Sequence, residues 1–150
     1  MLLTTSMLHL IKDLSDRFFN LLKEDPVRPH IPHEHRIGKN KDIFVLEEEN
    51  QPGAITCVSY QISIPENEDN LFELCDTPNT AVFYTIWSYK SGRGRQLILD
   101  SVNYIQEHRT SVRNFVTLSP KTEMARKFHL NNGAKVLREN ADTINYIYVK

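Results

Sequence analysis

The sequence predicts a mixed α/β fold whose sheet contains a central parallel strand–helix–strand crossover. Three observations favour this fold class. Residues 80–87 are nearly all apolar or β-branched, as in a central strand. A helical pattern of apolar residues covers 96–108, and a second apolar run follows at 112–119. A strand, a helix and a strand at this spacing are typical of a parallel crossover.

Length and composition indicate one ordinary globular domain. The chain has 150 residues, of which 40% are hydrophobic and 25% charged, so we expect a single domain over 1–150. Its net charge of -1 gives no general attraction to nucleic acid or to an anionic membrane. No apolar stretch has membrane-spanning length, and the first six residues lack a signal-peptide pattern, so we expect a cytoplasmic protein. In that compartment, Cys57 and Cys75 are expected to be buried free thiols.

The N-terminal region predicts an amphipathic helix over 5–24. Its apolar residues recur every three or four positions, at Leu8, Ile11, Leu14, Phe18 and Leu21. Three prolines within 25–32 then prevent the helix from continuing.

A short histidine-rich segment follows these prolines. His30, His33 and His35 suggest zinc, because imidazole is a frequent zinc ligand. Their spacing is not that of two histidines one helical turn apart. We therefore interpret the segment as a polar connecting loop and expect no metal site.

Residues 42–47 and 54–64 form the next predicted elements. Both are strand-like, and the polar turn between them predicts an antiparallel hairpin. The acidic stretch 65–78 is expected to be irregular, with one helical turn at 71–74.

The last third of the chain begins with the apolar run that ends at Ser119. Pro120 is expected to open a helix that extends to Asn132, with Ser119 as its N-cap. Gly133 suits the left-handed position that follows a helix. Two short strands are expected to close the chain, at 135–138 and 143–149.

The expected crossover brings a glycine-containing turn to the ligand-binding edge of the sheet. Parallel strands place their carboxyl ends on one edge, so the turn at 92–94 should lie beside Ser119. A glycine-rich turn that opens a helix binds anions, and Lys90, Arg93 and Arg95 add positive charge. We interpret it as a pyrophosphate site for a small molecule. Ser119 as a helix cap and His129 as a partly buried core histidine remain alternatives to functional roles.

Two stretches resemble the GNAT acyl-CoA-binding superfamily. Residues 89–94 resemble its Gln/Arg-x-x-Gly-x-Gly/Ala pyrophosphate loop, with Tyr89 where Gln or Arg is usual. Residues 125–134 resemble its Ala-x-x-x-Tyr-x-x-x-Gly-Phe helix, with His129 in place of the tyrosine. The resemblance implies a GNAT-like acyl-CoA N-acyltransferase fold. It also implies cofactor contacts from Tyr89, Lys90, Ser91, Gly92, Arg93, Gly94 and Arg95.

A narrower resemblance, over residues 80–150, is to the catalytic domain of malonyl-CoA decarboxylase. It is carried in order by Ala81-Val82-Phe83-Tyr84, Thr117-Leu118-Ser119-Pro120, Phe128-His129-Leu130-Asn131-Asn132-Gly133-Ala134 and Asn145-Tyr146-Ile147-Tyr148. The family's catalytic serine and histidine fall on Ser119 and His129. The resemblance implies that Ser119 positions the substrate carboxylate and that His129 donates a proton. We expect further substrate contacts from Trp87, Ser88, Asn132 and Tyr146.

The implied reaction converts malonyl-CoA to acetyl-CoA and CO₂. No cofactor is required, because CoA enters as part of the acyl-CoA substrate. A histidine with an ordinary pKa near 6.5 donates a proton close to neutral pH. The chain has no room for the family's helical domain, which supports oligomerisation there, so a homo-oligomer is left open. The alternatives are a GNAT-type N-acyltransferase, in which His129 protonates the departing thiolate, and a non-catalytic acyl-CoA-binding module.

Overall fold

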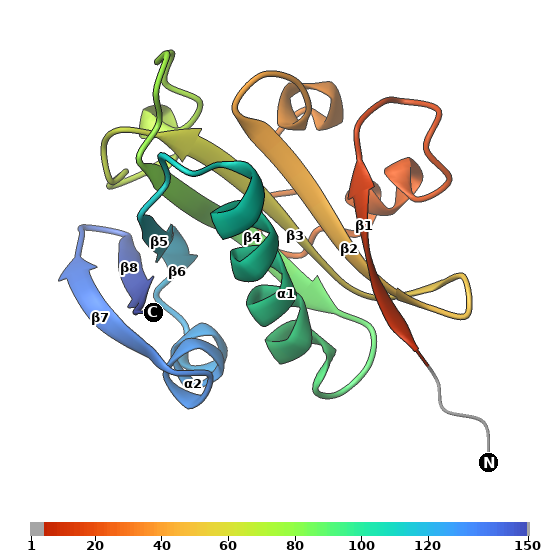
Figure 1. Ribbon diagram of the computed structural model, residues 1–150. Helices are drawn as coiled ribbons and strands as arrows, with labels where there is room; N and C mark the ends of the chain where they lie inside the picture. Colours follow the sequence, from red (N-terminus) through yellow and green to blue (C-terminus); the bar gives the residue numbers. More distant parts are fainter. Residues whose placement is uncertain (1–4, 150) are drawn as a thin grey trace.

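One mixed sheet organises the part of the chain that the computed structural model describes, residues 5–149 (Figure 1). The strands are β1 (Ser6–Ile11), β2 (Lys41–Glu48), β3 (Gln51–Gln61), β4 (Thr80–Ser88), β5 (Asn114–Thr117), β6 (Ser119–Pro120), β7 (Ala134–Glu139) and β8 (Thr143–Tyr148). Their order is β1-β2-β3-β4-β5-β8, and β6 and β7 both pair with β8. The prediction that the chain starts without a signal-peptide pattern concerns mostly residues 1–4, which lie outside the described residues.

Two α-helices and three short 3₁₀ helices accompany the sheet. They are α1 (Arg93–His108), α2 (Glu123–Asn131), η1 (Phe19–Glu24), η2 (His33–Arg36) and η3 (Glu68–Asn70). None of the helices within 5–149 is long and apolar enough to cross a membrane. The predicted helical turn at 71–74 is wrong, because the turn that forms is η3.

The predicted crossover is confirmed. β4 and β5 are parallel, with Thr80 opposite Asn114 and Phe83 opposite Thr117, and α1 connects them. The other strand pairs are antiparallel, including the predicted β2–β3 hairpin. That hairpin turns at Glu49 and Asn50, whose φ angles of 51° and 67° fit a two-residue type I′ turn. The mixed α/β fold class follows from this arrangement.

The predicted helix over 5–24 is wrong. Its first half is β1, which pairs with β2 and sets Leu8 opposite Leu46. A turn then separates β1 from η1. There Asp13 Oδ1 accepts the backbone N–H of Ser15 at 2.9 Å, and Asp16 Oδ1 accepts that of Phe18 at 2.9 Å. Aspartate side chains that bond nearby N–H groups compete with helix formation, and pairing with β2 decides the outcome.

The sheet is covered on both faces. Helix α1 lies across one face, where Leu97, Ile98 and Ile105 pack with alternate β2 residues such as Phe44 (Figure 1). The segment containing η1 and η2 covers the opposite face, where Phe18, Leu22 and Ile31 pack with Ile43 and Val45. Burial on both sides explains why the central strands are almost continuously apolar.

The predicted thiols differ in burial. Cys57 is fully buried within β3, as predicted, whereas Cys75 is partly exposed. Both are free. The prediction of burial is therefore wrong for Cys75, which lies in the irregular stretch between β3 and β4.

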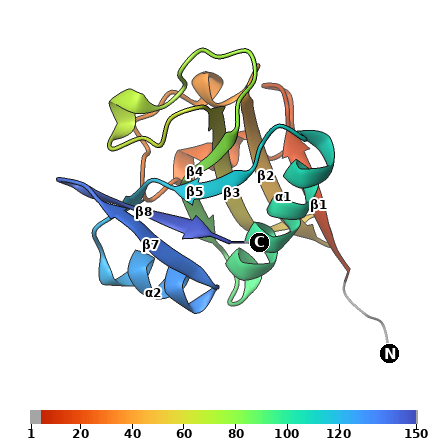
Figure 2. The same cartoon turned by 60° about the vertical axis from the view of Figure 1, so that its left-hand side comes forward.

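β4 and β5 separate halfway along β4. Their pairing ends at Phe83, whose carbonyl accepts the N–H of Leu118 at 3.1 Å. Beyond this point β4 continues along β3 to Ser88, while Ser119 and Pro120 turn away to pair with β8 as β6. The predicted strand 112–119 is therefore interrupted, and a gap opens between the two strand ends. Figure 2 shows α2 beside β7 and β8.

Candidate functional site

A cavity of about 630 Å³ occupies the region where β4 and β6 diverge. It is lined by β4 from Phe83 to Ser88, by Leu118, Ser119 and Pro120, by α2, and by single residues of other segments. Its lining includes five of the predicted site residues, namely Trp87, Ser88, Gly94, Ser119 and His129. Among the described residues that line it there is no Asp, Glu, Lys or Arg.

Ser119 is not the N-cap of α2. The helix begins at Glu123, and Thr122 is the N-cap, because Thr122 Oγ1 accepts the N–H of Ala125 at 3.2 Å. Ser119 instead lies in β6, opposite Ile144 of β8. The prediction of a serine cap is therefore wrong, and the Ser119 hydroxyl is available for other contacts. The predicted left-handed residue after the helix is confirmed, since Gly133 has a φ of +98°.

Ser119 and His129 lie in direct contact. Ser119 Oγ is 3.2 Å from His129 Nε2, and both side chains are almost fully buried. The Ser119 hydroxyl also donates to Thr117 Oγ1 at 2.8 Å. On the other side of the ring, His129 Nδ1 is 2.7 Å from the Tyr148 hydroxyl. Four side chains from β5, β6, α2 and β8 thus form one chain of hydrogen bonds.

The imidazole is held firmly in this chain. The ring of Tyr146 stacks on it with centroids 4.9 Å apart, and Phe128 packs against it edge to face. Tyr146 therefore lies behind His129 and does not line the cavity. Such packing fixes the ring plane of His129, so that Nε2 faces Ser119.

Burial sets the protonation state of His129. It lowers the pKa of His129 to about 4, so the ring is neutral at neutral pH. Burial also raises the pKa of Tyr148, which keeps its phenol protonated. Because a phenol is the better hydrogen-bond donor, we assign the Tyr148 hydroxyl as donor to Nδ1 of His129. The ring proton is then on Nε2 and points to Ser119 Oγ.

The glycine turn starts α1 three residues earlier than predicted. Gly92 is the N-cap with a φ of +79°, a left-handed conformation that favours glycine, and the first turn of α1 contains no acidic residue. No side chain caps this helix end. Backbone N–H groups at such an end attract anions.

The three cations predicted beside the turn differ in availability. Arg93 forms an ion pair with the buried carboxylate of Glu48, so part of its charge is already balanced. Lys90 and Arg95 form no ion pair with any residue of 5–149. Ser91 is exposed in the same turn.

Gly94 connects the turn to the cavity. A Cβ atom at this position would lie 2.7 Å from Cε1 of Phe128, closer than side chains can approach. Glycine is therefore required for the contact between α1 and α2. This contact brings the N-terminus of α1 to the cavity that contains Ser119 and His129.

Apart from the five residues named above, the predicted site residues are not among those that line the cavity. The Trp87 indole lines it and donates to the Tyr89 hydroxyl at 3.0 Å, and that hydroxyl donates in turn to Glu24. Asn132 is the C-cap of α2 and does not line the cavity. The histidine-rich segment forms η2, and the residues within 5–149 contain no group of three side chains placed to hold a metal ion.

Sequence reasoning missed several residues of the site. Thr117 and Tyr148 flank the Ser119–His129 pair, and their motifs carried the resemblance without a role being assigned to either hydroxyl. Pro26 and Val27 line the cavity from a segment that was read only as a proline-containing loop. No local pattern marks these two residues as part of a site, since they reach it only through tertiary packing.

Comparison with known proteins identifies the fold. No protein-family model and no curated protein matches the chain. Among solved structures, malonyl-CoA decarboxylase from Agrobacterium vitis matches with a TM-score of 0.79 and 17% identity, over 97% of this chain and 60% of that chain. The enzyme from Rhodopseudomonas palustris matches with a TM-score of 0.73 and 17% identity, over 96% of this chain and 56% of that chain. A GNAT family acetyltransferase from Elizabethkingia anophelis, with acetyl-CoA bound, matches with a TM-score of 0.67 and 11% identity, over 97% of this chain and 98% of that chain.

These matches confirm the predicted GNAT-like fold. The chain spans about 60% of the length of the decarboxylase from Agrobacterium vitis and a similar share of the others. It covers nearly the whole length of the acetyltransferase from Elizabethkingia anophelis. At these low identities the likeness concerns the fold, which both kinds of enzyme share.

Proposed function

We propose that this chain binds an acyl-CoA thioester and decarboxylates malonyl-CoA, or a closely related malonyl thioester, to acetyl-CoA and CO₂. The observation that carries the proposal is the contact between Ser119 and His129 in a cavity without ionised side chains at neutral pH. The structural likeness to malonyl-CoA decarboxylases supports it.

The N-terminus of α1 is the proposed binding site for the CoA pyrophosphate. Its uncapped N–H groups and the side chains of Lys90 and Arg95 supply positive potential for a phosphate group. Gly94 lies at the boundary between this turn and the cavity. A thioester bound with its phosphates at the turn would extend its acyl end into the gap between β4 and β6.

The proposed reaction breaks the bond between the malonyl Cα and its carboxyl carbon. CO₂ leaves, and the electron pair of that bond remains on Cα and the thioester oxygen as an enolate. The Ser119 hydroxyl binds the carboxylate before it leaves. Beyond Phe83, β4 no longer pairs with β5, and in this proposal a backbone N–H of β4 on that side stabilises the enolate oxygen. His129 then delivers a proton to Cα.

The apolar lining of the cavity favours loss of the substrate carboxylate as CO₂. A carboxylate is poorly solvated among apolar side chains, whereas CO₂ is neutral, so burial of the substrate destabilises the ionised group that is lost. The same carboxylate raises the affinity of the neighbouring imidazole for a proton, because opposite charges favour each other. His129 is thus neutral in the free protein and becomes protonated as the substrate binds. General acid catalysis of this kind contributes roughly 10²–10⁴-fold.

A GNAT-type N-acyltransferase is the second candidate. The full-length match to an acetyltransferase with acetyl-CoA bound favours it. An acceptor amine must lose a proton, and a cationic acceptor needs a negative charge to bind it. The cavity supplies no carboxylate among its described lining residues. Decarboxylation, which needs neither an acceptor nor a carboxylate base, fits this lining better.

The decisive experiment incubates the purified protein with malonyl-CoA and measures acetyl-CoA and CO₂ by chromatography and a coupled assay. We expect turnover without any amine or added cofactor, and a loss of 100-fold or more in His129→Ala, on the order expected for a lost general acid. Product formation by His129→Ala at the wild-type rate would refute the mechanism. Release of CoA only on addition of an amine would identify an acyltransferase. Tight acyl-CoA binding without turnover would identify a binding module.

A further inference from the structure

The cavity extends through the sheet from one face to the other. Gly94 and Phe128 line its end on the face that α1 covers. Trp87 belongs to the hydrophobic core on the opposite face and lines the same cavity together with Pro26 and Val27. An acyl-CoA held at the N-terminus of α1 would therefore direct its acyl group toward Val27.

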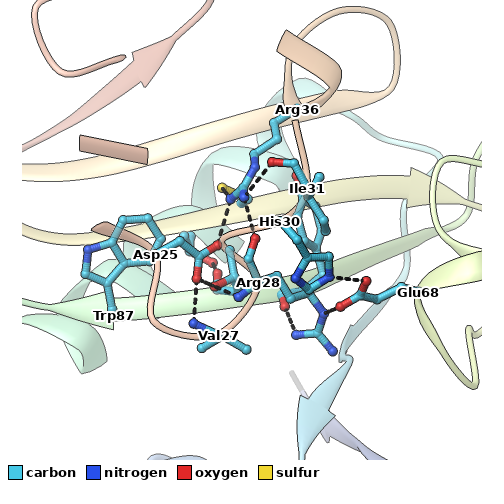
Figure 3. Close-up of polar contacts among 12 residues, drawn as sticks. Asp25, Val27, Arg28, His30, Ile31, Arg36, Glu68 and Trp87 are labelled. Atoms are coloured by element: carbon cyan, nitrogen blue, oxygen red, sulfur yellow. Dashed lines mark hydrogen bonds and ion pairs between the residues drawn. The ribbon is translucent and has the colours of Figure 1, made fainter. Parts of the chain in front are cut away.

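The wall formed by Pro26 and Val27 is tied to β4 by the carboxylate of Asp25. Its Oδ1 accepts the backbone N–H of Val27 at 2.7 Å and the hydroxyl of Thr85 at 2.7 Å. Figure 3 shows this carboxylate between Val27 and the guanidinium of Arg36. Because Thr85 itself lines the cavity, the wall and the strand opposite Ser119 are held in one arrangement.

A fully buried ion pair holds Asp25 in place. Arg36 Nη1 donates to Asp25 Oδ2 at 2.7 Å, and both side chains are inaccessible to solvent. The same guanidinium donates through Nη2 to the carbonyl oxygens of Arg28 and Ile31, at 2.7 Å and 3.1 Å (Figure 3). The backbone on the C-terminal side of Val27 is therefore fixed as firmly as Val27 itself. These contacts hold the wall in place at this end of the cavity.

Arg28 adds a second tie between this loop and β4. Its Nη1 donates to the carbonyl oxygen of Tyr84, and its Nε is 3.0 Å from Glu68 Oε1. Tyr84 is the extra residue of a β-bulge, because Cys57 pairs with Thr85 whereas Val58 pairs with Phe83. The loop thus contacts β4 at the two residues where the strand bends into the gap.

The geometry points to Val27 as a specificity-determining residue that restricts the acyl group to short chains. This inference rests on the acyl-CoA function proposed above and deepens it. Val27 is half-buried, apolar and fixed by its own backbone N–H, so its side chain sets the depth of the cavity at this end. In this inference, acetyl and malonyl thioesters end before they reach Val27, and longer acyl chains contact it.

The test compares the affinities of acetyl-CoA and butyryl-CoA by isothermal titration calorimetry. Neither ligand can be decarboxylated, so the measurement does not depend on turnover. In Val27→Ala the affinity for butyryl-CoA relative to acetyl-CoA should rise by about tenfold, the effect typical of one or two methylene groups in an apolar pocket. Val27→Ile should lower the same ratio. Leu137→Ala, at a residue of β7 that is 41% exposed and outside the cavity, is the matched control and should keep the wild-type ratio.

The outcomes separate this inference from the proposed function. Binding of both ligands with an unchanged ratio in Val27→Ala would overturn the role of Val27 and leave the acyl-CoA site standing. Failure of the wild-type protein to bind either ligand would overturn both. Because Val27 is only half-buried, the variants are expected to fold, and melting temperatures close to wild type check this.

Discussion

Replacing His129 with glutamine should flatten the dependence of stability on pH between pH 7 and pH 5. Burial holds the pKa of His129 at about 4 in the folded protein, whereas a histidine in an unfolded chain has a pKa near 6.5. The unfolded state therefore binds the proton more tightly. The contribution of neutral His129 to the free energy of unfolding is therefore fully present above the unfolded pKa, near 6.5, and is lost as the pH falls toward 4.

The size of the effect follows from these two pKa values. At pH 7 both states are largely unprotonated at this residue, so the contribution of His129 to the pH dependence is small. At pH 5 the unfolded chain is almost fully protonated and the folded protein mostly is not. The difference corresponds to a loss of about 2 kcal/mol in the free energy of unfolding on going from pH 7 to pH 5.

Urea unfolding at both pH values measures this loss. The wild-type protein should lose about 2 kcal/mol more than His129→Gln, because glutamine does not titrate. The pKa of His33 is also lowered by burial, but His33 is present in both proteins and its contribution cancels. Met124→Gln, at a position of α2 that is 83% exposed, is the control and should behave as wild type. An equal loss in wild type and His129→Gln would show that His129 is not the buried neutral group described above.

Other substitutions test separate features of the site. Thr122→Ala should cost about 1 kcal/mol in the free energy of unfolding through loss of the α2 cap, and a urea midpoint equal to wild type would contradict this. Ser119→Ala should lower the rate of decarboxylation and also cost stability, because it leaves the buried Nε2–H of His129 without its acceptor; turnover and chemical unfolding measured together check this. Gly94→Ala should lower the melting temperature and weaken CoA binding, because the added methyl group would meet the ring of Phe128; unchanged binding would contradict it. Arg36→Met should cost roughly 3–5 kcal/mol by leaving the buried carboxylate that it pairs with unmatched, and a urea midpoint equal to wild type would disprove that estimate.

The crossover was predictable because its evidence is local. β4, α1 and β5 each carry their own apolar pattern, and the connection between parallel strands follows from those patterns. The first 24 residues were not predictable in the same way. The apolar spacing of Leu8 and Ile11 fits a helix, and only pairing with β2 makes this segment a strand.

The pairing of Ser119 with His129 was predictable, and the surroundings of this pair were not. Ser119 and His129 were placed by motif resemblance, and they lie together in the structure. The local pattern indicated Ser119 as the helix cap, because a serine followed by a proline is a typical helix start, whereas the structure uses Thr122. Val27 joins the cavity through Asp25, which bonds Thr85 sixty positions away in the sequence. A contact between residues so far apart in the sequence produces no periodic pattern in either segment, so sequence analysis does not detect it.

The separation of β4 from β5 at Phe83 has a consequence for how this protein can change. Two neighbouring parallel strands would gain regular backbone hydrogen bonds if they stayed paired to their ends, and the space between them would disappear. Selection for stability alone would therefore close the gap. A variant with more complete pairing at Leu118 and beyond should be harder to unfold and should lose the space for the proposed thioester. In this fold, the cavity exists because the sheet leaves the pairing between β4 and β5 incomplete.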